Sequence, residues 1–380
     1  MPPVNVLIKP ASSACNMACE YCFYRDVSSH RTHSFEGMLT LGQMEQIIAS
    51  AMEFAEGSCS FAFQGGEPTL AGLDFFRETV KLQKKYSKSG VTVFNSIQTN
   101  GLLIDEEWAR FLARERFLVG LSLDGPGSLH DRNRKDHSGQ GTQQRVLNTA
   151  KLFDRFRVEY NILCVLTGEN ARSIDEIYRF YRKNGFEYLQ FIPCLEPMDR
   201  QRGEQSYHLS AEEYADFLLN IFDLWFEDLQ KGRYISIRHL DNWLSILLGQ
   251  RPEACAMTGC CSIQFVVEGD GSVYPCDFYV TDEWKLGNVK TDSFSQLLNS
   301  DKARHFVRSS LVPPEECRRC SLAALCRNGC RRDRVPDQAG IPGKNYYCEA
   351  YRRFFTERKQ QLLHACSIIL QMRRQYREQQ

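Results

Sequence analysis

The chain has 380 residues, which is enough to bury one large core and to form a second, smaller domain. Lysine and arginine together number 47, as do aspartate and glutamate, so no overall charge draws the protein toward nucleic acid or an anionic membrane. The start "MPPVNVLIKP" has no signal sequence and no apolar stretch is long enough to span a membrane. These features predict a cytoplasmic protein, in which the sixteen cysteines stay reduced and form no disulfide framework.

Two kinds of segment alternate in the first half of the sequence. Apolar runs that predict buried parallel strands lie at residues 4–10, 59–68, 91–100, 117–125, 158–167 and 188–195. Each of the first five is followed by an amphipathic segment such as "TLGQMEQIIASAMEFA", and several of these begin with a capping Asp, Ser or Thr. About six successive β-α units predict a parallel sheet, either doubly wound or curved into part of a barrel.

Polar sequences follow several of these strands. The second, third and fourth strands end in "QGGEP", "QTNG" and "SLDG", and a cysteine-bearing loop follows the first. In barrels of this kind the chemistry takes place where strands end and βα loops begin. The sequence therefore predicts a ligand site at this edge of the sheet.

The composition changes near residue 250. Helices are predicted at about 210–230 and 238–248, after which come short cysteine-bearing segments, a hairpin "IQFVVEGDGSVYPCDFYV" and a long charged helix from about Tyr347 onward. We therefore expect two domains, at residues 1–250 and 251–380.

The cysteines fall into two groups with four single members. Cys59, Cys164, Cys194 and Cys366 stand alone in apolar surroundings and are expected to be buried hydrophobic residues. The first group is "CNMACEYC", with Cys15, Cys19 and Cys22. Thiolates select zinc, copper(I) or iron–sulfur clusters, and structural zinc needs four ligands where this loop offers three. Three cysteines on a [4Fe–4S] cluster leave one iron open for another ligand.

The spacing C-x3-C-x2-C at the end of a first strand, with Tyr21 before the third cysteine, resembles the radical S-adenosylmethionine (SAM) superfamily. That resemblance implies a partial (β/α)6 barrel in which the amino and carboxylate groups of SAM bind the open iron. It also implies that the reduced cluster cleaves SAM to a 5′-deoxyadenosyl radical, which abstracts a hydrogen from substrate. The positions that match the cofactor-binding residues of the superfamily are Tyr21, Gly66, Ser122, Arg134 and Leu195.

The second cysteine group resembles the SPASM domain, a small cysteine-rich domain that carries two auxiliary [4Fe–4S] clusters. The resemblance assigns Cys255, Cys261, Cys276 and Cys330 to one cluster, and Cys317, Cys320, Cys326 and Cys348 to the other. Four cysteines on each cluster leave no open iron, which suits electron transfer. Cys260 is an extra thiol beside Cys261, and side chains of consecutive residues point apart in extended backbone. Paired C-x2-C sequences also bind zinc, which is the alternative for this group.

The whole chain resembles the anaerobic sulfatase-maturating enzymes, in blocks such as "FAFQGGEPTLAG", "FLVGLSLDGP" and "QFVVEGDGSVYPCDFYV". The resemblance implies oxidation of a Cys or Ser, within Cys/Ser-x-Pro-x-Arg of a sulfatase, to Cα-formylglycine. A base removes the side-chain proton and an auxiliary cluster accepts the remaining electron; Asp277, directly after Cys276, matches the position of that base. Gln64, Tyr24 and Gln98 are expected to line the peptide channel.

The same resemblance implies an unfolded or nascent sulfatase polypeptide as substrate and an electron donor such as ferredoxin or flavodoxin. A SPASM enzyme that forms thioether or carbon cross-links in a ribosomal peptide would share every cluster. Many such enzymes carry an N-terminal peptide-recognition module, whereas Cys15 comes almost at once here. A zinc-binding interaction protein is the non-enzymatic alternative, and iron and sulfide in anaerobically purified protein would exclude it.

Overall fold

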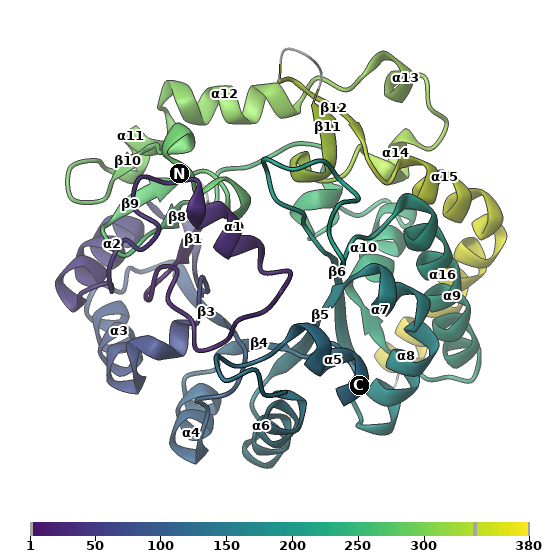
Figure 1. Cartoon of the computed structure of the whole chain (residues 1–380), viewed down its shortest axis with the longest axis horizontal. Helices are drawn as coiled ribbons and strands as arrows, with labels where there is room; N and C mark the ends of the chain where they lie inside the picture. The colour runs from purple at the N-terminus through teal and green to yellow at the C-terminus, as the bar shows by residue number, and fades with distance from the viewer. Residues whose placement is uncertain (1–2, 337–339, 379–380) are drawn as a thin grey trace.

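Six parallel strands form the curved sheet at the centre of the molecule. The computed structural model describes residues 3–336 and 340–378. The strands pair in chain order, each parallel to the next, and the sheet curves into part of a barrel (Figure 1). They are β1 (Val4–Ile8), β2 (Gly57–Phe63), β3 (Val91–Thr99), β4 (Leu118–Ser122), β5 (Tyr160–Leu166) and β6 (Tyr188–Pro193). The prediction of a partial (β/α)6 barrel is thus confirmed, and all six predicted strands are present.

Helices cover the outer face of the sheet (Figure 1). Their apolar residues face the strands, and side-chain caps fix several starts: Thr40 and Ser210 each form a capping box with the third helical residue. The helices of the barrel are α1 (Phe23–Ser29), α2 (Leu41–Phe54), α3 (Leu73–Lys85), α4 (Glu106–Arg114), α5 (Gly127–Asn133), α6 (Gln143–Phe156), α7 (Gly168–Arg172), α8 (Ile174–Lys183), α9 (Ala211–Gln230) and α10 (Arg238–Leu247).

The second half of the chain extends the same sheet at both edges. The strand β7 (Ser236–Ile237) pairs with β6, and β8 (Val266–Val267) pairs with β1 in parallel register. The predicted hairpin is formed by β8 and β9 (Ser272–Tyr274), and β10 (Gly287–Asn288) follows, so the sheet has the order β10-β9-β8-β1-β2-β3-β4-β5-β6-β7. The cysteine-rich part therefore joins the barrel at β1, the strand that leads into the first cysteine loop.

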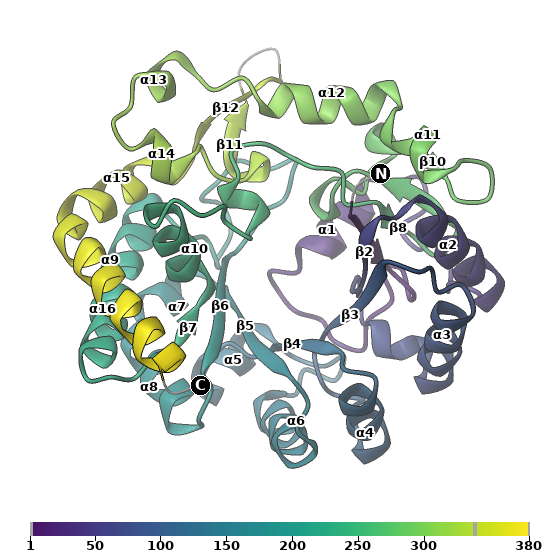
Figure 2. The same cartoon turned by 180° about the vertical axis from the view of Figure 1, so that it is seen from behind.

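The remaining elements form a layer of short helices and a two-stranded sheet. They are α11 (Phe294–Leu298), α12 (Asp301–Ser310), α13 (Glu315–Arg318), α14 (Ala323–Cys326), β11 (Arg334–Pro336), β12 (Pro342–Asn345), α15 (Cys348–Glu357) and α16 (Lys359–Glu378). The long helix predicted from Tyr347 is in fact two helices, α15 and α16, which lie along α9 and α10 (Figure 2). Arg358 stands between them, and its guanidinium makes two hydrogen bonds to Asp223 of α9, at 2.7 and 2.8 Å.

Burial of the single cysteines is as predicted. Cys59, Cys164, Cys194 and Cys366 are buried and unpaired. Among the described helices, none is long and apolar enough to cross a lipid bilayer.

Candidate active site

The first cysteine loop begins directly after β1 and turns back at Ser12, which has a left-handed φ of 48°. Cys15, Cys19 and Cys22 are all half-buried in this loop. Burial, together with the nearby Glu67, Cys19 and Cys22, raises the pKa of the Cys15 thiol to about 12. Thiols held this way need a metal centre to become thiolates. The loop therefore brings three potential ligands together, as the sequence predicts.

The glycine-rich end of β2 packs directly against this loop. The amide of Gly66 donates a hydrogen bond to the Ser12 carbonyl and the amide of Glu67 donates one to the Ala14 carbonyl, both at 2.8 Å. A Cβ atom added to Gly66 would lie 2.0 Å from the carbonyl oxygen of Ala14. Glycine is required here so that two backbone segments can approach each other.

Glu67 of the same sequence "GGEP" is fully buried and ties two strand ends together. Its carboxylate accepts hydrogen bonds from the amide and hydroxyl of Thr69, from the hydroxyl of Thr99 and from the amide of Asn100, at 2.6–3.1 Å. Both carboxylate oxygens of Glu67 therefore accept hydrogen bonds from within the protein. Glu67 thus shapes the edge at the ends of β2 and β3.

Three side chains at the end of β4 form a buried group. The hydroxyl of Tyr21 donates to Asp124, and Nε of Arg134 lies 3.0 Å from the same carboxylate. The Arg134 guanidinium also lies 5.4 Å from the centre of the Tyr21 ring. Asp124, in "SLDG", was not among the site residues predicted from the sequence; a buried carboxylate needs such partners to offset desolvation. Asp124 therefore holds Arg134 at the edge of the sheet where the βα loops follow the strands.

The other predicted cofactor positions lie at the same edge of the sheet. Ser122 is the last residue of β4 and is buried, and Leu195 follows β6 and is half-buried. Tyr21 belongs to the cysteine loop. The other four residues lie at or beyond the carboxyl ends of three strands: Gly66 after β2, Ser122 and Arg134 at and after the end of β4, and Leu195 after β6.

Asp277 of the cysteine-rich part faces residues of the barrel. It follows Cys276 in a 3₁₀ turn (Asp277–Tyr279) and is 8% exposed. Its Oδ1 forms an ion pair with Lys9, and its Oδ2 accepts a hydrogen bond of 2.6 Å from Nε2 of Gln64. Lys9 lies just beyond β1 and Gln64 just beyond β2, so one carboxylate meets the ends of both strands.

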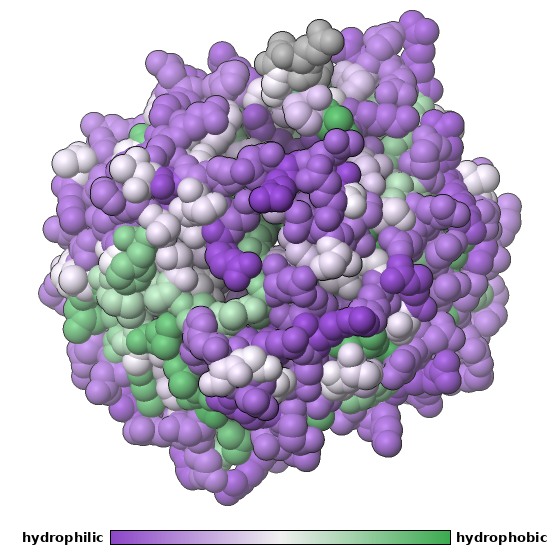
Figure 3. All heavy atoms as spheres, viewed as in Figure 1, coloured by the Kyte–Doolittle hydropathy of each residue, from purple (hydrophilic) through white to green (hydrophobic). Residues whose placement is uncertain are grey.

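A cleft of about 1020 Å³ runs along the concave face of the sheet. Gln64 and Gln98 line it at the strand ends, as predicted, and Gln190 and Arg238 line it further along. The face shown in Figure 3 is hollowed near its centre, and mostly hydrophilic residues border the hollow. Tyr24 is not part of this lining, because it is 2% exposed and its hydroxyl donates to Glu268. The expectation that Tyr24 lines the channel is therefore wrong; it supports the wall from behind.

The later cysteines also gather in two sets. Burial raises the pKa of the Cys330 thiol, and the nearby Cys261 and Cys255 raise it further. Cys330 and Cys255 act in the same way on Cys276. In the other set, burial raises the pKa of Cys326 to about 11, and Cys348, Cys317 and Cys320 add to that effect.

The spacing of these sulfur atoms bears on the metal. Four thiolates on one zinc ion lie roughly 3.8 Å apart, since each Zn–S bond is about 2.3 Å. Within residues 3–336 and 340–378, no three cysteines have sulfur atoms that all lie within 4.8 Å of one another. As they stand, the described sets are more open than the four sulfur ligands of a single zinc ion, and a set of four cysteines is a donor set that [4Fe–4S] clusters take.

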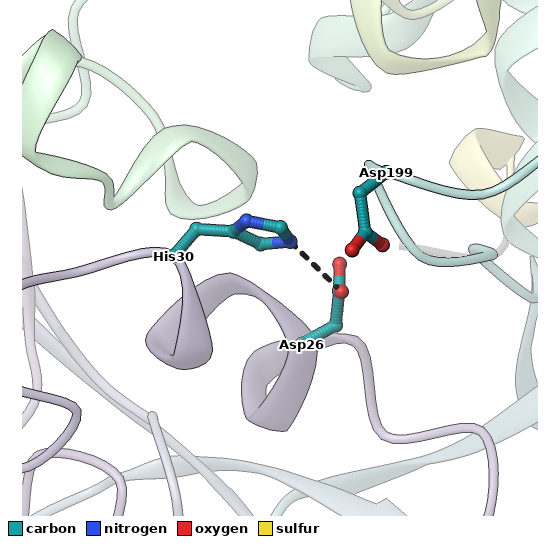
Figure 4. Close-up of side chains that lie close together, drawn as sticks. All are labelled: Asp26, His30 and Asp199. Carbon is teal, nitrogen blue, oxygen red and sulfur yellow. Dashed lines mark hydrogen bonds and ion pairs between the residues drawn. The ribbon is translucent and has the colours of Figure 1, made fainter.

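Asp26, His30 and Asp199 are the side chains whose ligand atoms do lie within 4.8 Å of one another in the described chain (Figure 4). Asp26 already accepts hydrogen bonds from His30, at 3.2 Å, and from the amide of Met198, also at 3.2 Å. The group links α1 to the segment after β6. These contacts account for the cluster without a metal ion.

Two family models match the chain. "Radical SAM superfamily" matches residues 10–181, and "Iron-sulfur cluster-binding domain" (SPASM) matches residues 258–321. The fold and the cysteine sets thus define a radical SAM protein with a SPASM domain, which holds SAM and three [4Fe–4S] clusters.

Characterised relatives narrow this class. The chain is 46% identical over 355 residues to the cysteine-type anaerobic sulfatase-maturating enzyme of Clostridium perfringens, a match that covers 93% of this chain and 96% of that one. It is 30% identical over 370 residues to the serine-type enzyme of Bacteroides thetaiotaomicron, with 93% and 89% covered. A solved structure, "Native anSMEcpe with bound AdoMet and Cp18Cys peptide", superposes with a TM-score of 0.93 at 44% identity and covers 97% of this chain and all of that one.

The chain belongs to the family of anaerobic sulfatase-maturating enzymes. It is a protein-modifying radical SAM oxidoreductase that oxidises a side chain of a target sulfatase to Cα-formylglycine.

Proposed function

We propose that this enzyme converts the Cys of a Cys-x-Pro-x-Arg sequence in an unfolded sulfatase to Cα-formylglycine, with Asp277 as the catalytic base. The observation that carries the assignment of the base is the contact of Asp277 with both Lys9 and Gln64, of which Gln64 lines the cleft. The higher identity to cysteine-type relatives, 46% against 30% for a serine-type one, supports Cys as the preferred target.

Separate residues of the chain would act on the target side chain and on the cofactor. The bound cofactor supplies the radical that takes a hydrogen from the β-carbon of the target residue. Asp277 accepts the proton of the target thiol, and its ion pair with Lys9 and its hydrogen bond from Gln64 hold the carboxylate in place. Arg134, fixed by Asp124, has donors left for the carboxylate of SAM, and Tyr21, Gly66, Ser122 and Leu195 complete its site.

The cluster ligands follow from the three cysteine sets. We assign Cys15, Cys19 and Cys22 to the cluster that binds SAM. The auxiliary cluster beside Asp277 takes Cys255, Cys261, Cys276 and Cys330, and the other takes Cys317, Cys320, Cys326 and Cys348. Because Cys276 directly precedes Asp277, a residue that would hold the electron-accepting cluster adjoins the residue that would take the proton.

Cys260 and Cys261 should respond differently to replacement. The amide of Cys261 is fixed by the Ser310 hydroxyl at 2.9 Å, and its thiol is an electrostatic neighbour of Cys255. Cys261→Ala is expected to lose one auxiliary cluster, whereas Cys260→Ala should keep about twelve iron atoms per chain. Iron and sulfide analysis after anaerobic reconstitution measures this difference. Loss of a cluster in Cys260→Ala alone would mean that Cys260 is the ligand.

Partners and location follow from the same chemistry. We propose that the enzyme works in the cytoplasm, where its thiols stay reduced, and receives electrons from a donor such as ferredoxin or flavodoxin. Neither nucleic acid nor a membrane is expected as a partner, since the basic and acidic residues balance at 47 each.

Peptide substrates test the proposed function. Anaerobic, reconstituted enzyme is incubated with SAM, reductant and a synthetic peptide that carries Cys-x-Pro-x-Arg, with the Ser version in parallel. Mass spectrometry should find formylglycine from both peptides, with the larger kcat/KM on Cys. A thioether or carbon cross-link in place of formylglycine would overturn the proposal, and faster oxidation of Ser would overturn the preference.

A further inference from the structure

Behind Asp277 lies a buried group of charged residues that the proposed reaction does not use directly. The group consists of Lys9, Tyr24, Arg31 and Glu268, each at most 7% exposed. Two carboxylates, Asp277 and Glu268, here face two cations, Lys9 and Arg31. Buried charges are costly unless they are paired, so this arrangement needs all four.

Glu268 is the centre of the group. Its Oε1 accepts a hydrogen bond from the Tyr24 hydroxyl and lies 2.8 Å from the Arg31 guanidinium. The same guanidinium lies 3.5 Å from the Tyr24 oxygen and donates to the Ser34 carbonyl at 2.7 Å. Burial raises the pKa of Glu268 to about 7, and the nearby Lys9 ammonium opposes that shift. The Tyr24 hydroxyl is therefore held by a fully buried partner.

Tyr24, held by Glu268, in turn holds Lys9 in place. The Lys9 ammonium lies 3.7 Å from the centre of the Tyr24 ring, within the range of a cation–π contact, and pairs with Asp277 on its other side. The orientation of the Tyr24 ring therefore determines the position of the Lys9 ammonium. A rotation of Tyr24 would shift Lys9 and, with it, the carboxylate that Lys9 holds.

The seam between the two parts of the chain explains how these residues meet. In the parallel register of β1 and β8, Ile8 pairs with Val267, and the Lys9 amide donates to the Val267 carbonyl at 2.9 Å. Lys9 and Glu268 are the next residues along these two strands. The barrel thus supplies Lys9 and Tyr24, and the cysteine-rich part supplies Glu268 and Asp277.

From this geometry we infer that Glu268 is a positioning residue for the reaction: through the Tyr24 hydroxyl and the Lys9 ammonium it sets the place of the Asp277 carboxylate relative to the peptide. The inference rests on the proposed role of Asp277. Glu268 is 0% exposed and cannot touch a bound peptide, so its effect belongs to the orientation of the base and not to peptide binding.

The experiment compares Glu268→Gln, Tyr24→Phe and the double variant with wild type. Iron content, SAM cleavage and the KM for the Cys peptide should stay within about twofold of wild type. The yield of formylglycine per 5′-deoxyadenosine should fall by about ten- to a hundredfold, as for other small misplacements of catalytic groups. Because both residues act along one path, the double variant should be no worse than the poorer single variant.

A buried group of the same chemistry provides the matched control. Asp228 of α9 is 1% exposed, accepts the Tyr178 hydroxyl at 2.9 Å and pairs with Arg233 at 3.1 Å, and none of these three side chains contacts Asp277. Asp228→Asn should lower the midpoint of thermal unfolding and leave the yield per 5′-deoxyadenosine unchanged. A change of yield in this control equal to that of Glu268→Gln would make the Glu268 effect a general loss of stability.

The outcomes separate this inference from the proposed function. If Asp277→Asn uncouples the reaction while Glu268→Gln and Tyr24→Phe leave the yield as in wild type, Glu268 has no positioning role and the proposed function stands. If Asp277→Asn has no effect on the yield, both ideas fail. Should Glu268→Gln not assemble its clusters, Tyr24→Phe decides the matter, because it removes one hydroxyl and keeps the ring under Lys9.

Discussion

Replacement of Cys15, Cys19 and Cys22 by alanine is expected to abolish cleavage of SAM and with it all formation of formylglycine. We propose that these three thiols of the loop after β1 are the ligands of the SAM-binding cluster, and alanine offers no donor to iron. Three [4Fe–4S] clusters correspond to about twelve iron and twelve sulfide per chain, so the variant should retain about eight of each. The two auxiliary cysteine sets stand apart from this loop and should load normally.

Iron and sulfide analysis and chromatography of 5′-deoxyadenosine check this result. Cys59→Ala is the matched control, because Cys59 is a fully buried cysteine of β2 outside the three sets. It should keep all the iron and the full rate of SAM cleavage. SAM cleavage at the wild-type rate in the triple variant would contradict the assignment of the loop. Stoichiometric zinc in that variant would contradict the assignment of the two auxiliary clusters.

The strands could be predicted because parallel strands with both faces covered are nearly continuous apolar runs. The order of β1 to β6 follows from the alternation with helices, since each crossover returns the chain beside the previous strand. The hairpin that contains β8 could be predicted from its Gly and Asp turn, but its place beside β1 could not: two residues, Val266 and Val267, are too few to indicate which strand they pair with. The pairing of β8 with β1 is a tertiary contact, and the strand propensity of the individual residues does not predict it.

The same limit applies to the site. The cysteine spacings are local, so their grouping could be read from the sequence alone. Lys9, Asp124 and Glu268 were missed because their partners lie far away in the chain. Each is a charged residue directly after an apolar run, in "LIKP", "SLDG" and "VVEGDG". A charge at the end of a buried strand is a signal that could have marked all three, since it needs a buried partner.

Asp277→Asn should uncouple SAM cleavage from oxidation of the peptide. The amide keeps the size of the carboxylate and can still bond to Gln64, but it accepts no proton from the target thiol at neutral pH. Without deprotonation, the β-carbon radical of the peptide cannot readily pass on its electron. Loss of a general base commonly costs two to four factors of ten in rate, and each factor is about 1.4 kcal/mol of barrier.

The decisive measurement is the ratio of formylglycine to 5′-deoxyadenosine, taken with the iron content of the same sample. Asp282→Asn is the matched control: Asp282 lies in the same segment, but its carboxylate accepts bonds from the amide and hydroxyl of Thr32, both at 2.7 Å. Asp277→Asn should keep its clusters and still cleave SAM while the ratio falls, and Asp282→Asn should keep the ratio of wild type. Peptide oxidation near the wild-type rate in Asp277→Asn, with all clusters present, would mean that another group takes the proton and that the ion pair with Lys9 is structural.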